Sequence, residues 1–153
     1  KQLHKLDSIK YAGFLHDIGK IGIPDTILKK KTSLTFDEMQ IMKKHPEIGV
    51  KILKNISYFK ECFEGILHHH ERWDGDGYPN KLGKEKIPVI ARIVSVAEVF
   101  DVITCDKPYR EPKNLEQSHE EIMKNSRSQF DPDVVNAFDR LYKQGAIQAF
   151  YNK

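Results

Sequence analysis

The sequence predicts an all-α fold, and two observations carry that prediction. Apolar residues recur three or four positions apart along almost the whole chain, which is the spacing of helix faces. Prolines, glycines and capping pairs divide this pattern into segments of ordinary helix length. The chain has 153 residues and contains no internal repeat or low-complexity segment, so we expect a single domain with its own core.

The first two helices are predicted on either side of a loop. One covers about residues 5–18, and Pro24 breaks the loop that follows it. Thr35 and Glu38 form a capping-box pair, in which each side chain bonds the backbone N–H of the other residue. The helix that this pair opens is expected to reach His45.

Two further helices are predicted before the first long loop. Pro46 opens one of them at its first position, where the N–H that proline lacks has no helical partner in any case. The apolar face of this helix consists of Ile48, Ile52, Leu53 and Ile56. The other helix is indicated by the three- and four-residue spacing of Phe59, Phe63, Ile66, Leu67 and His70.

The C-terminal half is predicted to contain one long loop and three helices. The run GDGYP at residues 75–79 breaks the periodicity, so no helix is expected there. Residues 88–105 would also suit a buried strand, but their length favours a helix. Polar caps open two more helices over residues 114–126 and 131–145. The residues of the last helix that we expect to face inward are Val134, Val135, Phe138, Leu141 and Tyr142.

Composition and charge argue against several classes of protein. No apolar run approaches the roughly 20 residues that a membrane-spanning helix needs, so no membrane segment is expected. The net charge of +3 is too small to indicate a nucleic-acid polymer as partner. Cys62 and Cys105 are far apart and lack metal-ligand spacing, so we expect reduced, partly buried thiols in a cytoplasmic protein.

Residue types that bind metals are concentrated in a few short segments. They are His16, Asp17, His45, the run at residues 68–70, Glu98 and, more weakly, Asp101. Mixed imidazole and carboxylate ligands suit iron, manganese, zinc or nickel. An aspartate can bridge two ions, and two ions about 3.5–4 Å apart can share a water and activate it for attack on phosphorus. Lys20 lies one turn after His16 and would add a cation beside a phosphate oxygen.

Each of these residues has an ordinary structural explanation when it is taken alone. A His–Asp pair can simply end a helix, and His45 before Pro46 can be a cap. A histidine run can be a solvated surface, and Glu98 can be a buried ion-pair partner. We favour a shared metal site because the structural explanations would require four coincidences in one short chain.

Two other segments are candidates for ligand binding. The loop with Gly77, Tyr78 and Pro79 combines glycine, which allows close backbone approach, with an aromatic ring that could stack on a base or a partner protein. The alternative is a plain surface turn. Lys107 and Arg110 flank a Pro-Tyr pair and could hold a phosphate, although a solvated basic helix end explains them as well.

Taken together, these motifs resemble one family. The segments LHDIGKIGIPD, HPEIG, HHERWDGDGYP, IPVIARIVSVAEVFDVIT, DKPYR and QFDP occur in this order and cover most of the chain. They resemble the HD-GYP family, bacterial phosphodiesterases of the HD superfamily that hydrolyse cyclic di-GMP. The resemblance implies an HD-superfamily helical bundle with a GYP loop at the active-site rim. It also implies two or three divalent metal ions, with iron or manganese expected.

The resemblance further implies roles for individual residues. The metal ligands would be His16, Asp17, His45, His69, His70 and Glu98. Lys20 and Asp17 would serve catalysis, in which a metal-bridging hydroxide attacks phosphorus and yields pGpG, with GMP as a further product. The substrate-binding residues would be Lys20, Tyr78, Lys107 and Arg110. The rim loop, through which GGDEF-domain or other signalling proteins would bind, would contain Gly77, Tyr78 and Pro79.

The sequence departs from the family pattern in three places. The upstream metal-binding histidine of the family has no counterpart, because His4 lies only 12 residues before His16. Glu98 stands where the family has aspartate, and Lys107 stands where it has arginine. We therefore expect residues 1–153 to be an HD-GYP domain without its upstream metal-ligand helix, and we expect it to form a homodimer.

Two alternative functions remain open from the sequence. One is a degenerate HD-GYP domain that senses cyclic di-GMP or docks partner proteins without catalysis, which the departure at Glu98 favours. The other is an HD-type hydrolase of ordinary nucleotides, against which the GYP loop argues. Metal content separates the first alternative from the enzyme, and a substrate panel separates the second.

Overall fold

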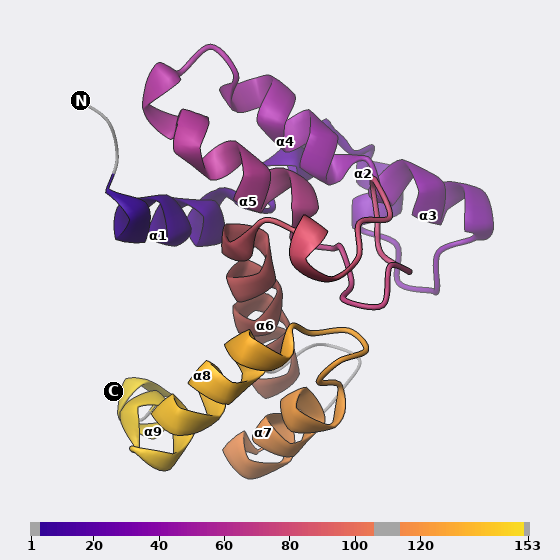
Figure 1. The fold of residues 1–153 in the computed structure, drawn as a ribbon. Helices are drawn as coiled ribbons and strands as arrows, with labels where there is room; N and C mark the ends of the chain where they lie inside the picture. The colour runs from indigo at the N-terminus through magenta and orange to yellow at the C-terminus, as the bar shows by residue number, and fades with distance from the viewer. Residues whose placement is uncertain (1–3, 106–113, 152–153) are drawn as a thin grey trace.

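A computed structural model describes residues 4–105 and 114–151, and this part of the chain is helical without any strand beyond an isolated bridge (Figure 1). The predicted all-α class is therefore confirmed. The elements are α1 (Lys5–Leu15), the 3₁₀ helix η1 (Ile18–Gly22), α2 (Asp25–Leu28), α3 (Phe36–Met42), α4 (His45–Leu53), the 3₁₀ helix η2 (Ser57–Cys62), α5 (Phe63–His68), the 3₁₀ helix η3 (Lys84–Lys86), α6 (Val89–Thr104), α7 (Leu115–Lys124), α8 (Pro132–Lys143) and α9 (Ala146–Tyr151). None of the helices described is long and apolar enough to cross a membrane.

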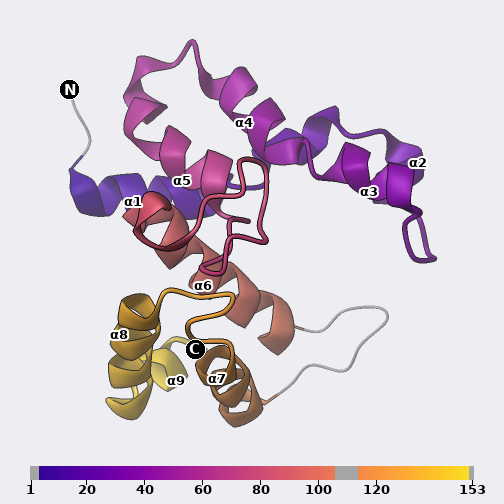
Figure 2. The same ribbon diagram turned by 45° about the vertical axis from the view of Figure 1, so that its right-hand side comes forward.

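Helix α6 lies between two groups of helices. It packs against α1 and α5 in one group and against α7 and α8 in the other. Figures 1 and 2 show α6 passing from the upper group, with α1, α4 and α5, to the lower group, with α7, α8 and α9. The short helices α2 and α3 project from the upper group beyond α4.

The two groups have separate apolar cores. The buried residues of the N-terminal core are Ala12, Leu53, Cys62, Ile66 and Val94. Helix α5 approaches α1 and α6 closely there, because a Cβ at Gly65 would lie 2.7 Å from the Cβ of Ala12. The buried residues of the C-terminal core are Val96, Phe100, Ile122, Phe130 and Val135. Helix α6 contributes to both cores, so it fixes their relative position.

Several predicted boundary signals are confirmed. Both capping boxes form, with Thr35 and Glu38 opening α3 and Asn114 opening α7. Residues 88–105 form a helix rather than a strand, and α6 ends at Thr104. Gly145 has a φ of 75°, a conformation that favours glycine, and it ends α8 as predicted.

Other predicted boundaries are wrong. The first helix ends at Leu15 instead of residue 18, and the helix predicted up to His70 is divided into η2 and a short α5 that ends at His68. The third predicted helix ends at Leu53, so Ile56 lies outside it. The apolar spacing continues past α1 because Ile18 of η1 also packs on the N-terminal core, whereas Ile56 after α4 is exposed.

The remaining corrections concern exposure and two unpredicted helices. Helices α2 and α9 lie in segments for which no helix was predicted. Leu141 is 49% exposed, although the spacing predicted an inward position. The free thiol of Cys62 is fully buried and that of Cys105 is exposed, so neither is partly buried.

Candidate metal centre

Four short segments bring the predicted metal ligands together. His16 directly follows α1, Asp17 precedes η1, and His45 is the first residue of α4. His69 and His70 directly follow α5. The sixth residue, Glu98, lies within α6. Almost all of these ligands therefore lie at helix ends, where the backbone changes direction and adjacent side chains can point to different places.

A close approach between η1 and α4 places the first two segments side by side. A Cβ at Gly19 would lie 1.8 Å from the backbone oxygen of His45 and 2.5 Å from the nitrogen of Gly49. Only glycine fits at such a contact. This packing brings Oδ1 of Asp17 to 3.3 Å from Nε2 of His45.

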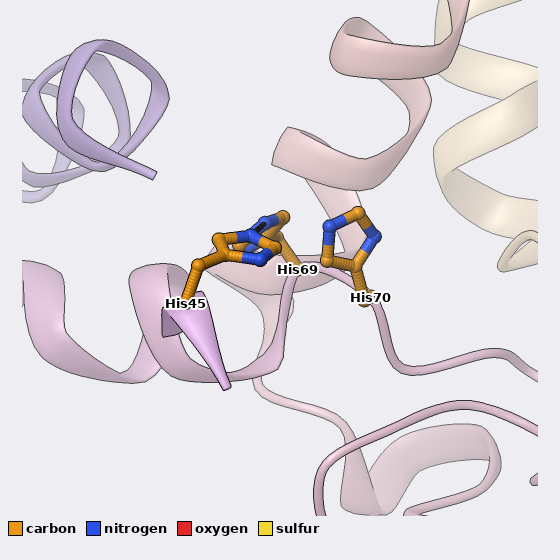
Figure 3. Close-up of side chains that lie close together, drawn as sticks. All are labelled: His45, His69 and His70. Atoms are coloured by element: carbon orange, nitrogen blue, oxygen red, sulfur yellow. Dashed lines mark hydrogen bonds between the residues drawn. The ribbon is translucent and has the colours of Figure 1, made fainter. Parts of the chain in front are cut away.

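The ligand atoms form two groups of three. One group, here called the histidine cluster, consists of His45, His69 and His70, whose rings converge in Figure 3. The other, the carboxylate cluster, consists of His16, Asp17 and Glu98. Within each group the ligand atoms all lie within 4.8 Å of one another. Each group is therefore compact enough for one ion.

Asp17 lies between the two clusters. Its Oδ2 lies 3.4 Å from Nε2 of His16 in the carboxylate cluster. Its Oδ1 lies 3.3 Å from Nε2 of His45 in the histidine cluster. The two oxygens of one carboxylate thus face the two groups, which is the arrangement that a bridging ligand requires.

Backbone carbonyls determine the tautomer of three histidines. Each ring has its Nδ1 within hydrogen-bonding distance of the carbonyl oxygen three residues earlier. The distances are 2.6 Å from His16 to Gly13, 2.9 Å from His45 to Met42 and 2.7 Å from His69 to Ile66. Because a carbonyl oxygen only accepts, Nδ1 must carry the proton. In the neutral ring, Nε2 is then left with a free lone pair, as metal ligation requires.

The hydrogen-bond acceptors at the centre of the site face no hydrogen-bond donor among the described residues. Nε2 of His45 lies 3.2 Å from Nε2 of His69, and in these tautomers both atoms are acceptors. Oδ1 of Asp17 is buried and has no hydrogen-bond partner among the described residues. Buried acceptors that face one another are costly unless a cation lies between them. The residues present therefore fit divalent metal ions.

Electrostatics keeps the histidine cluster neutral. Burial, reinforced by the neighbouring imidazoles, lowers the pKa of His69 to about 2 and the pKa of His70 to about 3. Both rings are therefore unprotonated at neutral pH and available as ligands. In the carboxylate cluster, burial alone would raise the pKa of Asp17, but its contacts with His16 and Lys20 hold that pKa well below its usual range.

Lys20 lies beside the candidate bridging carboxylate, as the sequence predicted. Its Nζ donates to Oδ2 of Asp17 over 2.6 Å, and its side chain remains 41% exposed. It lines a cavity of about 660 Å³ together with His16 and Glu98. The ammonium group is therefore held at the entrance of the carboxylate cluster, where an anionic substrate would meet it.

The GYP loop borders the other side of the site. The backbone N–H of Tyr78 donates to the oxygen of His70 over 3.2 Å, and the Tyr78–Pro79 peptide is cis. A Cβ at Gly77 would lie 2.4 Å from the nitrogen of Arg72, so the loop returns against the chain that follows the histidines. A cavity of about 270 Å³ lies there, lined by Gly77, Tyr78, His70 and Glu98 among others. The loop thus forms part of the rim.

Glu71 anchors this loop, and sequence reasoning missed it. Its buried carboxylate accepts hydrogen bonds from the backbone N–H groups of Asn80 over 2.7 Å and Leu82 over 3.0 Å. The partners lie nine and eleven residues further along the chain, so no local pattern could reveal them. The only signal was an acid that directly follows a histidine run.

Replacing Glu71 with glutamine should loosen the GYP loop. An amide group keeps one acceptor oxygen and would direct N–H groups at a backbone donor, which costs about 1–3 kcal/mol of unfolding free energy. We expect a lower midpoint in thermal unfolding and faster trypsin cleavage at Lys81 in the loop.

Glu64→Gln provides the control for this prediction. Glu71 and Glu64 both lie beside the ring of His68, with carboxylate oxygens 3.6 Å from its Nδ1 and its Nε2, respectively. The side chain of Glu64, however, is 65% exposed. It should therefore change stability and cleavage very little. Equal effects of the two variants would show that the loop does not depend on Glu71.

The other candidate residues have different outcomes. Lys107 and Arg110 lie outside the described residues. Asp101 joins neither cluster, because its Oδ1 accepts from the hydroxyl of Tyr151 over 3.2 Å. Lys43 was missed by the sequence analysis: its Nζ lies 5.2 Å from the centre of the Tyr78 ring, at the smaller cavity.

The fold and the site together define a class: all-helical proteins whose helix ends converge on histidine and carboxylate clusters suited to divalent metals. The chain belongs to the HD domain family, whose model matches residues 2–134. The resemblance to the HD-GYP phosphodiesterases of this family is confirmed by the relatives that the chain matches over most of its length.

Three relatives illustrate this similarity. A cyclic di-GMP phosphodiesterase of Thermotoga maritima is 47% identical over 138 residues, covering 89% of this chain and 38% of the relative. A 3'3'-cGAMP-specific phosphodiesterase of Vibrio cholerae is 43% identical, with coverages of 84% and 25%. The cyclic di-GMP phosphodiesterase response regulator RpfG of Xanthomonas campestris is 42% identical, with coverages of 86% and 35%. The chain thus spans well under half the length of these relatives.

Two solved structures share the fold. A cyclic GMP-AMP specific phosphodiesterase of V. cholerae has a TM-score of 0.70 at 21% identity, covering 91% of this chain and 38% of the other. An HD-GYP-type protein of Bdellovibrio bacteriovorus has a TM-score of 0.68 at 19% identity, with coverages of 91% and 44%. At these identities the similarity concerns the fold alone.

Proposed function

We propose that this chain is a metal-dependent phosphodiesterase that hydrolyses cyclic di-GMP to pGpG, with GMP as a further product. The observation that carries the proposal is the position of Asp17 between the two clusters. Its Oδ1 lies 3.3 Å from Nε2 of His45, and its Oδ2 lies 3.4 Å from Nε2 of His16. The relatives at 47% and 42% identity are both named cyclic di-GMP phosphodiesterases. A purely sensory, degenerate domain is less well supported, because each of the two clusters brings three ligand atoms within 4.8 Å of one another.

In this proposal the metal ligands are the six residues of the two clusters. Divalent ions bound there would activate water and neutralise charge on a phosphoryl group. We propose iron or manganese, as the resemblance to the HD-GYP family implies, and the mixed set of neutral imidazoles and carboxylates suits both metals. Glu98 belongs to the carboxylate cluster, so we propose that it ligates in place of the aspartate of the family pattern.

The residues around the clusters would hold and orient the substrate. Lys20 would neutralise a phosphate oxygen from the larger cavity, where it already lies beside Asp17. The buried imidazole of His69 and the partly buried imidazole of His70 would close the inner side of the site to water. Lys107 and Arg110 remain proposed contacts of the second phosphate, on the basis of sequence.

A second substrate has support of its own. The V. cholerae relative at 43% identity is named as specific for 3'3'-cGAMP, which differs from cyclic di-GMP in one base. Both substrates have the same phosphodiester ring, so the clusters suit either one. Selection between them would depend on contacts to the bases.

The test combines metal content with turnover. Protein purified without oxygen should contain about two iron or manganese ions per chain, as expected for two ligand clusters. The same sample should convert cyclic di-GMP to pGpG faster than it converts 3'3'-cGAMP. Little metal and no turnover, with the nucleotide still bound, would support the sensor alternative. Absence of metal after loading with either ion would contradict the metal centre itself.

Several broader features remain part of the proposal. The outer side of the GYP loop is accessible at Asp76 and Asn80, which supports contacts with GGDEF-domain or other signalling proteins. We also propose a homodimer and a cytoplasmic location. Size-exclusion chromatography with light scattering would test the first, and cell fractionation would test the second.

A further inference from the structure

One histidine of the histidine cluster is held differently from the other site histidines. His16, His45 and His69 are each fixed through Nδ1 by a backbone carbonyl. Within residues 4–105 and 114–151, neither ring nitrogen of His70 has such a bond. A ligand ring without this restraint can rotate, and rotation would turn its nitrogen away from the cluster.

Tyr78 of the GYP loop contacts the ring of His70. Its ring stacks on the ring of His70, with centroids 4.7 Å apart and an angle of 23° between the planes. The other rings in contact with His70 are those of His45 and His69, at 5.1 and 4.1 Å. Because both belong to the cluster, Tyr78 is the aromatic contact that comes from outside it.

Tyr78 is itself well fixed. Its backbone N–H donates to the carbonyl of His70, so the two residues are joined by a hydrogen bond as well as by the stacked rings. The absence of a side chain at Gly77 lets the loop return to within contact of Arg72. The Nζ of Lys43 lies 5.2 Å from the centre of the Tyr78 ring, close enough for a cation–π interaction.

We propose that Tyr78 is a positioning residue for metal binding, which orients the imidazole of His70 toward His45 and His69. The inference rests on the proposed metal centre and deepens it. It gives the tyrosine of the GYP loop a role inside the site, in addition to any contact at the rim. Stacking requires a planar ring but no hydroxyl, so phenylalanine should replace tyrosine in this role.

The test is a titration of Tyr78→Leu and Tyr78→Phe with manganese, in which calorimetry measures the affinity of each site. Loss of a contact that orients a metal ligand typically weakens affinity by about 10–100-fold, and we expect this for one of the sites in Tyr78→Leu. Tyr78→Phe should bind both ions as the wild type does. With Co²⁺ as probe, Tyr78→Leu should alter the visible absorption spectrum, whereas Tyr78→Phe should preserve it. If Tyr78→Leu does not fold, Tyr78→Met replaces it, because methionine fills irregular space without a ring.

Tyr11→Leu is the matched control. Tyr11 makes edge contacts with Tyr58 and Phe59 at 5.8 and 5.6 Å and packs against the N-terminal core. Its loss should lower stability and leave both manganese affinities unchanged. An unchanged affinity in Tyr78→Leu would overturn the inference, as would an equal loss in Tyr78→Phe or in Tyr11→Leu. A wild type that binds no manganese, iron or cobalt would instead overturn the metal centre, and this role with it.

Discussion

Replacing Asp17 with alanine should leave a folded protein that no longer binds metal between the two clusters. This variant should also lose the hydrolysis of cyclic di-GMP. In the proposed metal centre, removing a carboxylate that faces both clusters would take a ligand from each of them. Stabilisation of a phosphoryl transition state by metal ions is worth several kcal/mol, so the rate of hydrolysis should fall by at least about 10³-fold. Metal analysis and pGpG formation on one sample would measure both effects.

The fold should tolerate this change. The ion pair of Asp17 with Lys20 joins side chains that are 36% and 41% exposed, and such pairs contribute about 0–1 kcal/mol. Loss of metal could therefore not be ascribed to unfolding. Circular dichroism should give the same helix content as in the wild type.

Asp25→Ala is the matched control. Asp25 pairs with Lys29 across one helical turn, but both side chains are more than 70% exposed and belong to neither cluster. Metal content and turnover should remain those of the wild type. If Asp17→Ala kept both properties as well, the two-cluster assignment would be wrong.

Replacing Gly19 with alanine should damage both stability and the site. The new Cβ would overlap the backbone oxygen of His45 at 1.8 Å, so η1 and α4 would have to separate. Overpacking a close contact typically costs about 1–3 kcal/mol, and a clash between two backbones lies at the upper end of that range or beyond it. Because the same contact places Asp17 beside His45, we expect weaker metal binding together with a lower unfolding midpoint.

Gly13→Ala makes the same chemical change without the clash. A Cβ at Gly13 would meet nothing within 4 Å, and the residue lies inside α1. Alanine in a helix interior is favoured over glycine by roughly 0.5–1 kcal/mol, so this variant should be slightly more stable than the wild type. Thermal unfolding of Gly19→Ala and Gly13→Ala, each with and without manganese, would distinguish the effects of the two glycines. Equal unfolding midpoints for Gly19→Ala and Gly13→Ala would show that stability does not depend on the close contact between η1 and α4.

The sequence predicted the features of this protein that depend on nearby residues. The capping box of Thr35 and Glu38 lies within one turn of helix, and so does that of Asn114 and Gln117. The candidate ligands were identified because metal-binding residue types are concentrated in a few short segments that match the HD-GYP motifs. The structure brings the six of them into two groups, while their role as ligands stays a prediction.

The features that the sequence could not predict depend on contacts between distant residues. The apolar pattern continues through Ile18, so the change from α1 to η1 at His16 and Asp17 was hidden. The requirement for glycine at position 19 arises from the backbone of α4, and that contact leaves no trace in the local pattern. Glu71 likewise has partners in a loop whose course is set by packing.

Helix α6 has a consequence for communication within the protein. Val94 belongs to the N-terminal core and Val96 to the C-terminal core, and Glu98 follows two residues later on the same helix. A rigid helix cannot shift for one core without shifting for the other. A force or a binding event on α7 and α8 would therefore be transmitted along α6 to Glu98, whose carboxylate lies within 4.8 Å of the ligand atoms of His16 and Asp17.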